Sequence, residues 1–197
     1  MTVSERASEA VARRPNGPLR HFVRAHHGYR QRSLAPAQHL GMPSPYLTVI
    51  FTLDEPLQVA RHSDPRQSPE TYAALLGGLH SSPALVVHDG AQSGIQLQVS
   101  PLAARPLIGL PAGELASLDA QAGEVLGPLA TEVYERLRAT NDWSARFAVL
   151  DRLLGAALNT DRAVTGRSCP RDAGVRHMSD GQATSRVSSI ATLKTKG

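Results

Sequence analysis

The chain has 197 residues, of which 41% are hydrophobic and 4% aromatic, with one cysteine and a formal net charge of +4. This length suits one globular domain with a sizeable core. A single cysteine excludes a disulfide framework and fits a reducing compartment. Residues 1–162 hold 15 arginines and no lysine against 15 acidic residues, whereas residues 163–197 hold six basic and two acidic residues. The net charge therefore lies in the last segment and gives no argument that the folded part binds nucleic acid.

No part of the sequence predicts insertion into a membrane or secretion. No window approaches the roughly 18 consecutive apolar residues that cross a bilayer. The N-terminal segment alternates charged and polar residues and lacks the apolar stretch of a signal peptide. We therefore expect a cytoplasmic protein.

The first half of the chain predicts short strands separated by turns. Residues 1–18 are polar and rich in arginine, and we expect them to form a flexible arm. Residues 34–46 carry three prolines and predict a loop. Strand-like segments recur at close intervals over residues 19–99, which is typical of a sandwich or small barrel rather than of βαβ units. The expected strands are 19–32, 47–53, 57–61 (which could return as a hairpin partner of 47–53), 72–79, 84–88 and 94–99.

The hydrophobic period changes from two to 3.6 residues after position 99. Ser100 and Pro101 predict the start of a helix, which Pro106 should limit to about two turns. A second helix is expected to open at residues 127–128 and a third near residues 141–142, and the short loop between them predicts an antiparallel pair. Residues 161–197 lack any sustained period and bury too little apolar surface to offset the entropy of ordering, so we predict a disordered tail.

The helix pair carries an apolar stripe that something must cover. The stripe is either ordinary core or a dimer interface, and the residues alone favour core. The candidate dimerisation residues are Val133, Leu137, Trp143, Phe147, Leu150 and Leu154.

The order of these elements resembles the N-terminal sensory domain of AraC/XylS-type bacterial transcription regulators. The resemblance is carried by GIQLQV, SPLAARPLIGLPAGEL, LGPLATEVYERL and WSARFAVLDRLL within residues 94–158, and upstream by HGYRQR, PSPYLTVIFTLD and GGLH. It implies an α+β fold, in which a small cupin-like antiparallel β-barrel or sandwich (19–99) precedes an antiparallel helix pair within a helical part (100–160). It further implies that the β part senses a small-molecule effector and that the helices form a homodimer, or a heterodimer with a full-length relative.

A DNA-binding unit of two helix-turn-helix motifs normally follows in this family. Here only 35 residues follow position 162, and none of them resembles such a motif. We expect this chain to lack specific DNA binding itself. A change of reading frame or a premature end is the simplest account, and a natural short form is the alternative.

Seven histidines lie in the β half, where cupin-like barrels can bind metal through inward histidines and carboxylates. None of their spacings is diagnostic, so exposed or structural histidines are the favoured interpretation, and we predict neither a metal nor a cofactor. The histidines are His21, His26, His27, His39, His62, His80 and His88.

No catalytic motif is present, and we predict no enzymatic activity. Ser93, His88 and Asp89 are close in sequence but lack the G-x-S-x-G context of a nucleophile. Cys169 and His177 stand in the predicted tail without further ligands. The ligand-binding residues stay unassigned, and the alternative function is a stand-alone cupin-like protein that binds a small molecule or a metal.

Overall fold

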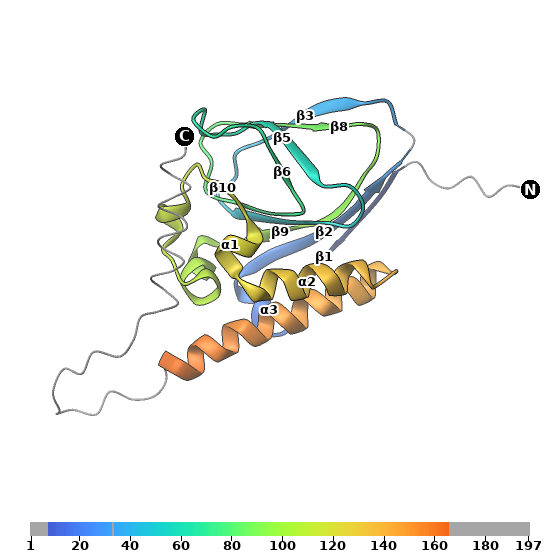
Figure 1. Cartoon of the computed structure of the whole chain (residues 1–197). Helices are drawn as coiled ribbons and strands as arrows, with labels where there is room; N and C mark the ends of the chain where they lie inside the picture. Colours follow the sequence, from blue (N-terminus) through green and yellow to red (C-terminus); the bar gives the residue numbers. More distant parts are fainter. Residues whose placement is uncertain (1–7, 33, 166–197) are drawn as a thin grey trace, which may run out of the picture.

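The computed structural model describes residues 8–32 and 34–165, and it consists of two antiparallel sheets followed by helices (Figure 1). The large sheet has the strand order β1-β2-β9-β4-β7-β10, and the small sheet has the order β3-β8-β5-β6. This arrangement confirms the predicted α+β class, and the β half is a two-sheet sandwich. The strands are β1 (Ser8–Arg13), β2 (Val23–Gln31), β3 (Ala37–Gly41), β4 (Leu47–Thr52), β5 (Leu57–Arg61), β6 (Glu70–Tyr72), β7 (Ala74–Gly77), β8 (Ala84–His88), β9 (Gln92–Val99) and β10 (Asp119–Gln121).

The helical part begins directly after β9. Ser100 caps the first turn as predicted, because its Oγ accepts a hydrogen bond from the Leu102 N–H at 3.3 Å. Gly109 ends the run of short turns with a φ of 82°, which glycine adopts without strain. None of the helices described here has the length and apolar character that crossing a membrane requires. The helical elements are η1 (Gly17–His21), η2 (Pro101–Ala103), η3 (Ala104–Ile108), η4 (Ala112–Leu115), α1 (Ala122–Leu126), α2 (Pro128–Arg138) and α3 (Trp143–Thr165).

The main hydrophobic core lies between the large sheet and the helices. Strand β9 alternates as expected: Ile95, Leu97 and Val99 are at most 1% exposed and belong to this core. Phe51 of β4 lies beside Ile95 in register and shares the same face. The apolar face of the central strands is thus covered by helices, and the opposite face turns towards the small sheet.

Helices α2 and α3 run antiparallel, as predicted, and lie side by side along the large sheet (Figure 1). Five of the six candidate dimerisation residues are at most 2% exposed within the single chain, and they join the main core. The sixth, Trp143, is half-buried and stacks on the Phe147 ring. This burial supports the core interpretation of the stripe, while dimerisation itself stays a prediction. The five are Val133, Leu137, Phe147, Leu150 and Leu154.

The prediction of a flexible arm over residues 1–18 is wrong for residues 8–18. Strand β1 pairs antiparallel with β2 along its whole length, and η1 follows it. The sequence SEAVAR alternates with the period of a strand, Val11 packs against the main core, and Arg13 forms an ion pair with Asp151 of α3. Residues 1–7 lie outside the described residues.

Three further expectations are corrected. Residues 37–41 form strand β3 instead of a loop, because they pair with β8. Strand β5 has the predicted bounds but pairs with β6 and β8 in the small sheet, so it is no hairpin partner of β4. Helix α3 continues to Thr165, so residues 161–165 are helical; the rest of the predicted tail, including Cys169 and His177, lies outside the described residues.

Candidate functional site

Part of the space between the two sheets is hollow, while a small cluster of buried residues, Val59, Tyr72, Leu75 and Ala84, packs in the rest. A cavity of about 310 Å³ lies there. This volume is at the lower end of the range of small-molecule sites in proteins. The cavity is lined by Tyr29, Gln31, His39, Gly41, Met42, Thr48, Ile50, Leu57, Val59, Leu75, Gly77, His80, Ala84, Val86, Gln92, Gln96 and Asp119.

The two walls of the cavity differ in polarity. The large sheet contributes most of the polar side chains, because the residues that alternate with its buried core residues point this way. The small sheet contributes mainly apolar side chains, and these include Val59 of β5 and Val86 of β8. The polar side chains from the large sheet are Tyr29, Gln31, Thr48, Gln92, Gln96 and Asp119.

Polar groups of this wall are left free to bind something other than protein. Gln31 and Gln92 hydrogen-bond to each other. Within the described residues, the structure shows no protein hydrogen bond for the side chains of Thr48 or Gln96. A glutamine amide carries two donor hydrogens and one acceptor oxygen, and these need partners when they are enclosed. The wall can therefore bind a ligand that both donates and accepts hydrogen bonds.

Asp119 is a buried carboxylate at one end of this wall, and two histidines bind it. It is 2% exposed, its Oδ2 lies 2.8 Å from His62 Nδ1, and its Oδ1 lies 3.2 Å from His80 Nε2. Burial raises the pKa of Asp119, but the hydrogen bonds from the two imidazoles outweigh it and hold the pKa below its ordinary value. Burial lowers the pKa of His80, but the hydrogen bond and the charge of Asp119 outweigh that effect and raise it. Asp119 is therefore ionised at neutral pH, and His80 is its direct counter-ion when protonated.

The backbone around Asp119 is fixed by a side chain that takes the place of a neighbouring strand. Gln67 Nε2 donates to the Asp119 carbonyl oxygen at 2.8 Å, and the Asp119 N–H donates to Gln67 Oε1 at 3.0 Å. On its other side, Asp119 pairs in register with Gly77 of β7. A Cβ atom on Gly77 would lie 3.1 Å from Asp119 Oδ1, so the glycine leaves the carboxylate uncovered. The result is a rigid acceptor at the cavity wall.

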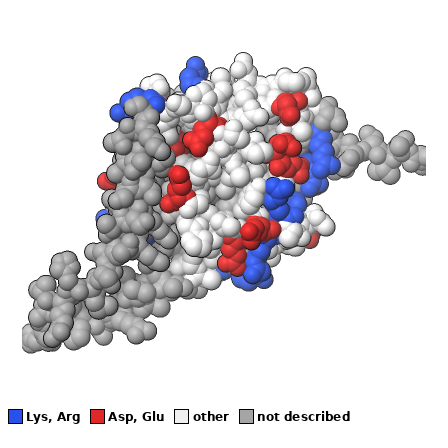
Figure 2. Space-filling view, in the orientation of Figure 1, with Lys and Arg blue, Asp and Glu red and all other residues white. Residues whose placement is uncertain are grey.

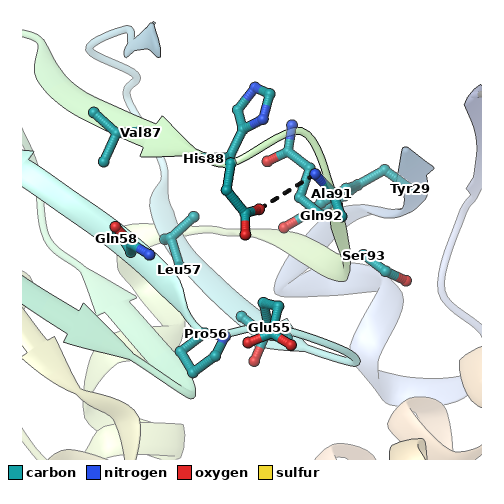
Figure 3. Close-up of a pocket in the computed structure, with 12 residues that line it drawn as sticks. Tyr29, Glu55, Pro56, Leu57, Gln58, Val87, His88, Ala91, Gln92 and Ser93 are labelled. Carbon is teal, nitrogen blue, oxygen red and sulfur yellow. Dashed lines mark hydrogen bonds between the residues drawn. The ribbon is translucent and has the colours of Figure 1, made fainter. Parts of the chain in front are cut away.

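A smaller pocket of about 40 Å³ adjoins the cavity at its other end, near the β4–β5 and β8–β9 connections (Figure 3). It shares Tyr29, Leu57 and Gln92 with the cavity. Figure 3 shows Glu55 and His88 on opposite sides of this pocket, which we call the end pocket. Asp89 also lines it and accepts a hydrogen bond from the Ala91 N–H at 3.4 Å.

The histidines of the β half are dispersed by the fold. His39 and His80 line the cavity, His62 binds Asp119, and His26 is buried beneath α3 against Phe147. No group of three histidine, cysteine or acidic side chains in the described ranges is arranged to hold a metal ion. The nearest arrangement is that of His62, His80 and Asp119, in which each imidazole binds a different carboxylate oxygen.

Ser93, His88 and Asp89 form no catalytic arrangement. The Ser93 hydroxyl is buried with no hydrogen-bond partner among the described residues. His88 Nδ1 accepts from the Gly90 N–H at 3.2 Å, and Asp89 caps the Ala91 N–H. These groups stabilise the turn between β8 and β9 instead of activating the hydroxyl.

Sequence reasoning missed the residues that make the site. Asp119 lies between the expected helices, in a stretch to which the sequence assigns no element, and nothing local marks it or Gln67. Gln96 carried a usable signal, because it alternates with buried residues on a strand at the centre of the sheet. The sequence does not decide what lies against the Gln96 face of β9, since either solvent or a second sheet could cover it.

Comparisons with known proteins identify no relative of this chain. A scan against protein-family models, a search of curated proteins and a search of solved structures each return no match.

Proposed function

We propose that this chain is the ligand-sensing and dimerisation region of an AraC-type bacterial transcription regulator in the cytoplasm. In this proposal, specific DNA recognition belongs to a domain outside this sequence. The observation that carries the proposal is the polar cavity on one face of the large sheet, whose other face packs against the C-terminal helices. A ligand in the cavity would be separated from α2 and α3 only by the large sheet. In this proposal, these helices pass the signal on to a partner.

Strand β2 contacts α3 on one side and lines the cavity on the other. Tyr29 points into the cavity, whereas the preceding residue, Gly28, faces α3. A Cβ atom on Gly28 would lie 2.6 Å from the Trp143 ring, so the indole rests directly on the strand backbone. A ligand can shift this contact only if it binds one position of β2 more tightly than another.

Ligand binding can be followed through Trp143, which is the single tryptophan of the chain. The experiment titrates the purified chain with a library of small polar molecules and records tryptophan emission and the melting temperature. A true ligand at 100 times its Kd should add about 2.7 kcal/mol to the free energy of unfolding and should change the emission of Trp143. The control variant is Gln96→Leu, which alters the polar wall without touching the main core and should abolish binding.

The sensing role is contradicted if no compound stabilises the chain. It is also contradicted if the stabilising compounds bind to the Gln96→Leu variant as tightly as to the wild type.

The DNA part of the proposal has its own test, a gel shift on the genomic region upstream of the coding sequence. We expect no specific band, and a specific, salt-resistant complex would contradict this part. On the face shown in Figure 2, basic and acidic side chains are interspersed over the described surface, in line with this expectation.

Dimerisation is tested by light scattering coupled to size-exclusion chromatography. Because the stripe on α2 and α3 is buried in the core, a dimer through this helix pair would use its outward face. A strict monomer at high concentration would contradict the dimerisation part while leaving ligand sensing intact.

A second candidate function is a stand-alone cupin-like protein that binds a small molecule or a metal. The observation in its favour is that Asp119 and His80 of one chain line the cavity, with His62 behind them on the same carboxylate. Metal analysis of the purified protein separates the two candidates, because stoichiometric zinc, iron or manganese would favour the second.

A further inference from the structure

We infer that the cavity binds a small molecule that carries no negative charge and donates a hydrogen bond to Asp119. This inference rests on the proposed sensing role and names the chemical class of the ligand. It is carried by three features of the wall: its charged groups, the free acceptor capacity of Asp119 and the polarity difference between the two sheets.

The cavity has one acidic side chain in its wall, Asp119, and the adjoining end pocket has two, Glu55 and Asp89. Asp119 lies level with Thr48 of β4, because both pair in register with Gly77. Glu55 and Asp89 line the end pocket, level with Thr52. Thr48 and Thr52 are four residues apart along β4, which corresponds to roughly 13 Å. Glu55 and Asp89 are exposed to solvent, so among the described residues Asp119 is the carboxylate that a ligand in the cavity meets directly.

No arginine or lysine is present among the described residues that line the cavity or the end pocket. His80 is the one side chain near Asp119 in the cavity wall that can offer a positive charge, and its Nε2 already contacts the Asp119 carboxylate. Burial, together with the neighbouring His88, lowers the pKa of His39, so His39 is neutral at pH 7. An anion would lose part of its hydration beside the Asp119 carboxylate without gaining a free cationic partner, so its binding is disfavoured.

Asp119 keeps acceptor capacity for a ligand. A carboxylate offers about four lone-pair positions, and the two imidazoles use one on each oxygen. The double hydrogen bond to Gln67 fixes the backbone, so a ligand bears little entropic cost of ordering this group. A hydrogen bond to an ionised acceptor in such a site is stronger than one between neutral groups.

The other lining residues indicate the polarity that the rest of the ligand should have. Gln96 and Thr48 offer donors and acceptors on the large-sheet side, whereas Val59 and Val86 present methyl groups from the small sheet. The matching molecule has one polar edge and one apolar face.

The test uses small molecules of similar size and shape whose polar head groups are anionic, neutral or cationic. The probes are benzoate, benzamide and benzamidine, together with pentanoate, pentanamide and pentylamine, at equal ionic strength and up to about 10 mM, since fragments of this size bind weakly. Binding to the full chain is measured by ligand-observed NMR, by Trp143 emission and by the melting temperature. We expect the amides and the cations to bind about tenfold or more tightly than the carboxylates.

Two variants connect this ranking to the site. Asp119→Asn should weaken binding of the cations about tenfold and change the carboxylates least, because it removes the charge and keeps the shape. Asp64→Asn is the control, since Asp64 pairs with Arg66 outside the cavity wall and should leave all six affinities unchanged. If Asp119→Asn does not fold, the wild-type ranking together with the loss of all binding in Gln96→Leu still tests the inference.

The outcomes separate the inference from the proposed function. If carboxylates bind as tightly as the cations, or if Asp119→Asn keeps the preference for cations, the inference is overturned and the sensing role stands. If none of the probes binds, or if Gln96→Leu binds them unchanged, the cavity is no ligand site, and both fail.

Discussion

The two faces of the large sheet border spaces of opposite character. On the helix side, Leu97 and its neighbours are fully buried in a packed apolar core. On the other side, Gln96 and its neighbours line a hollow with a polar wall. The same strands therefore stabilise the fold with one set of alternate residues and form a candidate binding site with the other. This separation lets the binding residues change without loss of the core.

The largest effect is expected where the packed side leaves no room for a side chain. A Cβ atom on Gly78 would lie 1.5 Å from the Leu115 carbonyl oxygen, a close approach that the Gly77-Gly78 pair permits. Gly78→Ala should therefore lower the free energy of unfolding by about 4 kcal/mol or more, or prevent folding. Chemical denaturation followed by circular dichroism measures this change.

The matched control for that prediction is Gly123→Ala in α1. No heavy atom lies within 4 Å of a Cβ built on Gly123, and alanine favours the helix by about 1 kcal/mol over glycine. If Gly78→Ala is as stable as Gly123→Ala, the region around Gly78 is less tightly packed than described.

A direct comparison of the two spaces uses neighbouring residues of β9. Leu97→Ala removes a fully buried side chain and should cost about 2–5 kcal/mol. Gln96→Ala should cost less than about 1 kcal/mol, because its amide lines the cavity and no protein hydrogen bond is lost among the described residues. Urea denaturation of both variants measures the difference, and similar losses would mean that the hollow contributes to stability as the core does.

His26, on the face of the large sheet that packs against α3, should make the free energy of unfolding depend on pH. Burial, with smaller contributions from the charges of Arg13 and His27, lowers the pKa of His26 to about 4. The unfolded chain binds a proton at this histidine below its ordinary pKa of about 6.5, whereas the folded chain resists protonation until about pH 4. Stability therefore falls as the pH drops through this window, by about 3 kcal/mol in total.

The substitution that isolates this contribution is His26→Leu, which places an apolar, non-titrating side chain against Phe147. Its free energy of unfolding should vary less between pH 7 and pH 4 than that of the wild type, by the same about 3 kcal/mol. His21→Leu is the control, because His21 is exposed in η1. An unchanged pH profile in His26→Leu would assign the dependence to other groups.

The elements that the sequence predicted well are those whose signals are local. Residues 57–61 and 84–88 have the predicted bounds because turn residues flank runs with strand propensity. Pro128 opens α2, and Ser100 caps the first turn, for equally local reasons. The three-residue strand β10 was missed because it depends on distant partners, namely β7 and the Gln67 side chain.

The candidate site was missed for a related reason. Alternation along β9 separates Leu97 from Gln96, but it does not show which face meets solvent. Polar residues on one face of a strand usually indicate water outside the protein. Here a second sheet encloses that face, and its pairing joins segments far apart in the chain, such as Ala37–Gly41 and Ala84–His88.

The contact between Trp143 and Gly28 sets the spacing of sheet and helix by the thickness of one indole ring. Elsewhere in the core, neighbouring side chains interdigitate, and a small displacement can be absorbed by a change of rotamer. At Gly28 there is no side chain whose rotamer could change, so a displacement there cannot be absorbed in this way. Motion of β2 would therefore pass directly to the start of α3, and the contacts of Arg13 with Asp151 and of His26 with Phe147 would carry it further along the helix.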